Sequence, residues 1–133
     1  MEYPDYSEEE MEKRIARFRG MKPNKMAFLD TRLSDHFRDI FNVIGTGVNE
    51  NVDTMPAISS VNGFTVAYNG CEPGKGAALH SHETCEVFVP LTGKWSVYWG
   101  MEGDHEAILD PFDVISLPTG ILRGFKNVGE EYS

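Results

Sequence analysis

The sequence predicts an all-β sandwich or barrel preceded by one helix. From about Phe37 onward, short apolar or alternating runs follow one another, separated by Gly, Pro, Asn and Asp, a texture typical of short strands joined by turns. The chain has 133 residues, of which 41% are hydrophobic, and this suits one compact domain with its own core. The expected strands lie at 41–45, 63–70, 85–91, 94–100, 105–110, 113–118 and 123–129.

The segment before the strands predicts a helix from Ser7 to Gly20. Ser7 and Glu10 match the S-x-x-E pattern of a capping box, acidic residues fill the first turn, and Gly20 follows two arginines at the end. The apolar stripe of this helix consists of Met11, Ile15 and Phe18. Because the stripe is narrow, we expect the helix to lie on the outside of another part of the fold.

Charge and composition exclude several classes of partner. Twelve basic residues against 21 acidic ones give a net charge of −9, so we expect no nucleic-acid partner and no anionic membrane surface. No apolar run approaches membrane-spanning length, and the first residues lack the apolar region of a signal peptide. Cys71 and Cys85 show neither CxxC spacing nor the density of a disulfide framework, so we expect a cytoplasmic protein.

A cluster of chemically active residues lies between Gly74 and Gly93. His80 and His82 are one residue apart, so on a strand their side chains project from the same face. The intervening residues 83–85 can turn the chain, and Glu86 can then begin a returning strand beside the first. Two imidazoles and one carboxylate would form a facial metal site with open positions. A histidine-rich turn on the surface fits the spacing equally well, so spacing alone leaves both readings open.

The wider pattern resembles the cupin superfamily. The first cupin signature is matched at every spacing by Gly74, His80, His82, Glu86 and Gly93. The segment at 112–127 is similar to the second signature and carries Asp113, Pro118, Gly120 and Asn127 in the expected places. The resemblance extends from about Phe64 to Asn127. It implies a cupin-type double-stranded β-helix, or jelly-roll barrel, at 37–133, after an N-terminal helix and arm at 1–36, in a single domain overall.

The resemblance also implies a ligand set, with one departure. His80, His82 and Glu86 correspond to metal ligands of the first signature, while Arg123 replaces the histidine that supplies the fourth ligand in cupins. Arginine cannot ligate a cation because its guanidinium stays protonated and offers only donors. Phe112 replaces the opening glycine of the second signature, a backbone detail to which we give little weight.

Two accounts of Arg123 remain open. In the first, Arg123 is a catalytic residue that adds its positive charge to an intact metal site and orients an anionic substrate, such as a carboxylate or an enolate. In the second, Arg123 pairs with Glu86 in a bidentate salt bridge, so the site binds no metal and the barrel is a binding module or scaffold. We favour the first account, because two histidines beside Glu86 have no obvious structural use.

The resemblance implies several possible activities. We expect a metal-binding enzyme acting on a small, anionic organic molecule, oxygenase-like and of the metal-dependent dioxygenase type. Iron(II) best suits a facial triad with open positions, and manganese, nickel and zinc also fit. The alternatives are a non-catalytic cupin that binds a small anionic ligand, and a cupin isomerase or lyase. We also expect a homodimer, because cupin barrels usually continue beyond the second signature and an unpaired strand edge needs cover.

The remaining polar and aromatic residues have simpler expected roles. Along 94–99, one set of side chains faces inward, and the sequence leaves open whether it is Trp95, Val97 and Trp99 or Lys94, Ser96 and Tyr98. Aromatic residues in barrels are more often core than substrate contacts. We expect Cys85 to be a buried structural thiol. His36 and His105 are expected to be exposed to solvent.

Overall fold

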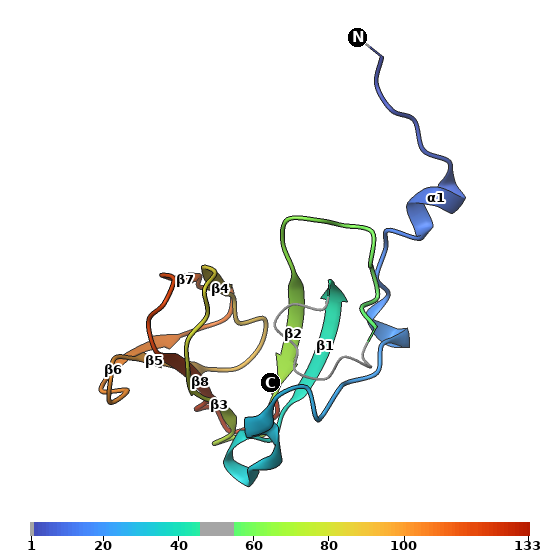
Figure 1. Ribbon diagram of the computed structural model, residues 1–133. Coiled ribbons are helices and arrows are strands. Elements are labelled where there is room, and N and C mark those ends of the chain that lie inside the picture. The colour runs from blue at the N-terminus through green and yellow to red at the C-terminus, as the bar shows by residue number, and fades with distance from the viewer. Residues whose placement is uncertain (1, 46–54) are drawn as a thin grey trace. The chain divides into compact units, whose positions relative to one another are not determined.

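The computed structural model describes residues 2–45 and 55–133, which form two compact units (Figure 1). One unit extends through Phe28 and resumes at Asp39–Asn69, and the other consists of Leu29–Arg38 and Gly70–Ser133. These units cut across the boundary that we expected between residues 36 and 37. No helix in the described part of the chain is long and apolar enough to cross a membrane.

The first unit contains a short helix and a two-stranded sheet. Its elements are α1 (Glu8–Glu12), the 3₁₀ turn η1 (Phe18–Gly20), and the paired strands β1 (Asp39–Ile44) and β2 (Val66–Gly70). The predicted capping box is confirmed: the Glu10 N–H donates to the Ser7 hydroxyl over 3.2 Å, and the Ser7 N–H donates to the Glu10 carboxylate over 2.8 Å.

The predicted length of the helix is wrong, because α1 ends at Glu12 and does not continue to Gly20. Residues 8–15 are all exposed, so no buried apolar face stabilises a longer helix, and short isolated helices are marginal in water. Phe18 instead packs its ring against Phe41 and Tyr68, with centroids 5.0 and 5.8 Å away.

The second unit contains six strands in two antiparallel sheets (Figure 1). Two 3₁₀ turns, η2 (Leu29–Arg32) and η3 (Ser34–His36), precede them. The strands are β3 (Gly76–His80), β4 (Glu86–Phe88), β5 (Trp95–Trp99), β6 (His105–Leu109), β7 (Ile115–Leu117) and β8 (Arg123–Asn127). One sheet has the order β3-β8-β5-β6, and the other pairs β4 with β7.

The hydrophobic core of this unit takes side chains from both sheets. Buried Val97, Leu109 and Leu117 form its centre. Partly buried residues packed against this centre are Phe88, Ile115, Ile121 and Phe125. Of the alternating residues in β5, Trp95 and Val97 are therefore core residues, and Trp95 also packs against the Phe125 ring. These contacts hold the two sheets against each other.

The predicted all-β class is confirmed, and every expected strand overlaps an observed one. Among the described strands, β1 alone begins before its expected range, at Asp39 instead of residue 41. The segment that ends at His80 was not among the expected strand ranges, and it forms β3. Among the described residues the sheets do not close into a barrel, so the observed architecture is antiparallel sheets, two of which share a core.

Candidate metal centre

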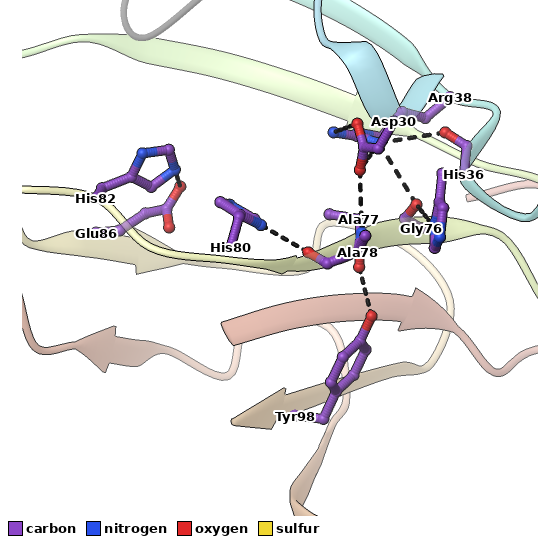
Figure 2. Close-up of polar contacts among 10 residues, drawn as sticks. All are labelled: Asp30, His36, Arg38, Gly76, Ala77, Ala78, His80, His82, Glu86 and Tyr98. Carbon is purple, nitrogen blue, oxygen red and sulfur yellow. Dashed lines mark hydrogen bonds and ion pairs between the residues drawn. The ribbon is translucent and has the colours of Figure 1, made fainter. Parts of the chain in front are cut away.

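His80, His82 and Glu86 come together at one end of the second unit. One donor atom from each side chain lies within 4.8 Å of the other two. The two imidazole rings have centroids 4.7 Å apart at an angle of 75°, and Figure 2 shows Glu86 next to the His82 ring. Each of the three residues is half-buried. The cluster predicted from spacing therefore exists as a group of potential ligands.

The backbone route to this cluster differs from the prediction. His80 is the last residue of β3 and Glu86 is the first of β4, but β4 pairs with β7 and not with β3. Residues 81–85 carry the chain from one sheet to the other. The expectation that Glu86 returns beside the histidine strand is therefore wrong, and the ligands converge across two sheets because both sheets border the same core.

The tautomer of His80 follows from its hydrogen bond. Its Nδ1 lies 2.7 Å from the carbonyl oxygen of Ala78 (Figure 2). A carbonyl only accepts, so Nδ1 must carry the hydrogen, and Nε2 keeps the lone pair that a metal needs. Hydrogen bonds of this kind orient histidine ligands in metal sites.

The surroundings of His82 favour its neutral form. Burial lowers the pKa of His82, and the positive charges of Arg123 and of any protonated His80 lower it further, while Glu86 acts in the opposite direction. Its Nε2 lies 3.8 Å from Glu86 Oε1, too far for a hydrogen bond. The backbone is fixed as well, because the Gly120 N–H donates to the His82 carbonyl over 2.9 Å.

Arg123 lies on β8, opposite His80 in the register with β3. Its side chain is 0% exposed, and its Nε donates to Glu86 Oε2 over 3.0 Å. Nη1 donates to the Ile121 carbonyl over 2.9 Å, and Nη2 is buried with no hydrogen-bond partner among the described residues. The contact with Glu86 uses a single N–H and is not the bidentate pair of the second account. Glu86 Oε1 remains beside His82.

This donor set fits a divalent metal ion. Two neutral imidazoles and one carboxylate are ligands that iron(II), manganese, nickel and zinc all accept. His80 presents its Nε2, burial lowers the pKa of His82 and so favours its neutral form, and one Glu86 oxygen is not bonded to Arg123. Three protein ligands of this kind would leave coordination positions for water or substrate.

Gly74 and Asn127 hold the backbone at the end of β3 and β8 that lies away from the cluster. Gly74 donates its N–H to the Asn127 carbonyl over 2.8 Å, and the fully buried Asn127 amide donates to the carbonyls of Cys71 and Glu131. Phe112 has φ +70°, in the left-handed region that favours glycine, which is the residue that the resemblance implies there. The backbone detail that we discounted in the sequence is therefore present as local strain.

Two expectations about individual residues are wrong, and one network of residues was missed. His36 is half-buried and its Nδ1 lies 3.0 Å from the Gly76 carbonyl, so it is not simply solvated. Cys85 is exposed, because it lies in the turn between the two sheets. The network of Asp30, Arg38 and Tyr98 around β3 was missed, since nothing in the sequence places residues 29–38 against that strand.

Comparisons with known proteins provide little further information. No protein-family model matches the chain, and no curated protein matches it. Among solved structures, the crystal structure of the protein TT1209 from Thermus thermophilus is 26% identical with a TM-score of 0.46. The match covers 51% of this chain and 63% of that chain. A TM-score at this level does not assign a shared fold.

Proposed function

We propose that this chain is a metal-dependent cupin that acts on a small anionic organic molecule, with oxygenase-like chemistry of the dioxygenase type. One observation carries the proposal. Donor atoms of His80, His82 and Glu86 lie within 4.8 Å of one another, and the hydrogen bond of His80 leaves its Nε2 available. Half-buried titratable side chains that converge in this way are a candidate functional site, because catalytic and metal-binding groups are gathered in such clusters.

The match of signature spacing supports membership of the cupin superfamily and its jelly-roll barrel. The structure is compatible with this proposal, since its two antiparallel sheets share a core and bring the first-signature residues together. Gly120 of the second signature bonds to the backbone of His82 of the first. This contact explains why the two signatures would belong to one site.

Charge supports an anionic substrate. A divalent ion, two neutral imidazoles and one carboxylate sum to about +1, and the guanidinium of Arg123 raises this to about +2. Because the cluster is half-buried, this charge would be screened less than on an open surface. A carboxylate or enolate would bind here more readily than a cation or a neutral molecule.

When bound, the metal would supply Lewis acidity and open positions for substrate and, with iron(II), oxygen. The residues of the chain position the three ligands before the metal binds. Ala78 fixes the His80 ring through its carbonyl, and Gly120 fixes the His82 backbone. Arg123 fixes Glu86 by bonding one of its two oxygens. The half-buried positions of the ligands limit the access of water.

The second candidate is a cupin that binds a small anion without a metal. The Arg123–Glu86 bond favours it, because a guanidinium 3.0 Å from the carboxylate competes with any cation for that ligand. An isomerase or lyase activity would use the same metal-loaded site and is distinguished from an oxygenase only by its reaction.

Metal content separates the two candidates. We expect about one divalent ion per chain after reconstitution with iron(II), manganese, nickel or zinc under anaerobic conditions, measured by elemental analysis. His80→Ala and His82→Ala should each lose the ion, whereas the matched control His105→Ala, an exposed histidine on β6, should retain it. Wild-type protein that retains none of the four metals contradicts the metal-dependent proposal and leaves the anion-binding module.

A further inference from the structure

Strand β3 contains an irregularity just before His80. Ala77 pairs with Phe125 and His80 pairs with Arg123, so three steps along β3 correspond to two steps along β8. The extra residue is a β-bulge, which interrupts the regular ladder and turns the side chains that follow it. The position of His80 therefore depends on what holds the bulge.

The peptide group between Ala77 and Ala78 is held at both ends (Figure 2). The Tyr98 hydroxyl donates to the Ala77 carbonyl, and the Ala78 N–H donates to Asp30 Oδ2 over 3.0 Å. The next carbonyl, that of Ala78, is the one that accepts from His80 Nδ1. Asp30 and His80 thus bond to the N–H and to the carbonyl of the same residue, Ala78.

Asp30 is itself fixed by a buried cation. Arg38 Nη1 and Nη2 each donate to a different oxygen of Asp30 over 3.1 Å, and the Arg38 side chain is only 5% exposed. Arg38 also donates to the carbonyls of His36 and Gly76. A bidentate pair of this kind sets the plane of the carboxylate as well as its position.

Tyr98 reaches β3 only because Gly124 has no side chain. Gly124 lies opposite Tyr98 in the register between β5 and β8. A Cβ at Gly124 would lie 2.5 Å from the Tyr98 hydroxyl oxygen and 2.6 Å from the Ala77 carbonyl oxygen. Both contacts are too close for any residue but glycine, so the tyrosine crosses β8 at this point.

We propose that Asp30, supported by Arg38 and opposed by Tyr98, is a positioning residue that holds the β3 bulge and so fixes the orientation and tautomer of His80. This inference deepens the proposed metal-dependent function and rests on it. Without the acceptor at Asp30, the Ala77–Ala78 peptide group keeps only the bond from Tyr98 at its carbonyl, and its N–H end is no longer held. The Ala78 carbonyl would then no longer hold the hydrogen on His80 Nδ1, and Nε2 would lose its fixed lone pair.

The test combines a metal-free and a metal-dependent measurement on the full chain. Nitrogen-15 NMR of the histidine rings, assigned through His80→Gln, reports the His80 tautomer without metal, and titration calorimetry measures the affinity for Co²⁺. For Asp30→Ala we expect mixed tautomers and a roughly 10- to 100-fold loss of Co²⁺ affinity, the range typical of lost support behind a ligand. Asp30→Asn keeps an acceptor for the Ala78 N–H and should recover most of both properties.

Asp35→Ala is the matched control, because Asp35 lies in the same segment, is 86% exposed and pairs only loosely with Lys75 at 3.8 Å. It should leave the His80 tautomer and the Co²⁺ affinity unchanged.

Tyr98→Phe removes the other bond to the same peptide group and should act in the same direction as Asp30→Ala. This second variant keeps the test valid if Asp30→Ala does not fold. If folded Asp30→Ala or Tyr98→Phe keeps the wild-type tautomer and Co²⁺ affinity, the positioning role is overturned. If wild type binds no Co²⁺, the proposed function fails, while the tautomer measurement still decides the role of Asp30.

Discussion

At the scale of single residues, Arg123 is expected to change metal affinity without being a ligand. Its guanidinium bonds to Glu86 and is fully buried, so it would lie close to any ion held by that carboxylate. A unit charge about 5 Å from a divalent ion opposes binding by about 2 kcal/mol even at the dielectric constant of water, and by more in a desolvated site. Arg123 therefore orients the ligand Glu86 and at the same time lowers the affinity of the site for a metal ion.

We therefore expect Arg123→Ala to raise Co²⁺ affinity at least about tenfold, and Arg123→His to raise it further by supplying a fourth nitrogen ligand. Titration calorimetry measures both, with the exposed Arg32→Ala in the same unit as the control. The role of Arg123 toward an anionic substrate is measured separately: Arg123→Ala should also weaken the binding of an anionic probe such as oxalate to the metal-loaded protein, and unchanged oxalate affinity would contradict that role.

Phe112 provides a second prediction at this scale. Its φ of +70° costs a residue with a Cβ about 1 kcal/mol, and its side chain is 76% exposed, so little packing offsets that cost. We expect Phe112→Gly to raise the free energy of unfolding by up to about 1 kcal/mol in urea titration. Phe112→Ala removes the same ring but keeps a Cβ, so it should give no such gain. Equal effects of the two substitutions on the free energy of unfolding would show that the φ of Phe112 does not strain the backbone.

At the scale of secondary-structure elements, β3 is an edge strand whose outer side is covered by side chains. Asp30, His36 and Arg38 bond to its backbone at Gly76 and Ala78. An unpaired strand edge is a common site of aggregation, and this segment satisfies its polar groups without adding a strand. The same contacts make the stability of β3 depend on the charge of Asp30.

The ionisation of Asp30 predicts an acid-sensitive stability. Burial alone would raise the pKa of Asp30, but hydrogen bonds from Arg38 and Ala78, with the charges of Arg38 and His36, outweigh it and lower that pKa. Tyr98, the remaining titratable group nearby, has its own pKa raised by burial and by Asp30, so it stays neutral in acid. The stability that Asp30 contributes is present above the pKa of an unfolded aspartate, near about 4, and is lost as the pH falls through its lower folded value.

Urea unfolding at a series of pH values tests this dependence. The difference in unfolding free energy between wild type and Asp30→Asn should be constant above about pH 5 and should shrink as the pH falls below about 4. Asp35→Asn, at an exposed carboxylate, serves as the control and should show little difference from wild type at any pH. A wild-type to Asp30→Asn difference that grows in acid would mean that the pKa of Asp30 is raised and not lowered.

At the scale of the whole molecule, we propose that the chain forms a homodimer. β6 lies at the other edge of the four-stranded sheet, and the described residues place no strand beyond it. Large apolar side chains are exposed around the second sheet, namely Val87, Val89, Leu91, Phe112 and Val114. A second copy could cover the open edge of β6 and these exposed apolar side chains, both of which favour aggregation when they remain in solvent.

Sedimentation equilibrium measures the oligomeric state directly. We expect a mass twice that of the 14.9 kDa chain at tens of micromolar protein, with dissociation on dilution. The net charge of −9 opposes association of two copies, so the dimer should be stronger at higher salt. A monomer at every concentration and salt level would contradict the proposal.

Local patterns in the sequence were enough to predict several features. The alternation of apolar residues predicted the strands, because a strand buries one face, and Ser7 with Glu10 predicted the start of the helix, because capping bonds span only three residues. The capping box and the strands are determined by neighbours in the chain. The spacing of His80, His82 and Glu86, together with the signature around it, predicted that the three residues cluster, but their convergence depends on the packing of two sheets on one core.

The tertiary structure decided what depends on distant contacts. The helix ends at Glu12 because residues 8–15 bury no apolar face, and Phe18 packs on Phe41 beyond it. β4 pairs with β7 where the two sheets share a core. Arg123 is 37 residues from Glu86, and Asp30 is 48 residues from Ala78. No local pattern records such pairs, because a hydrogen bond between distant residues is fixed only when the whole sheet has determined where each side chain lies.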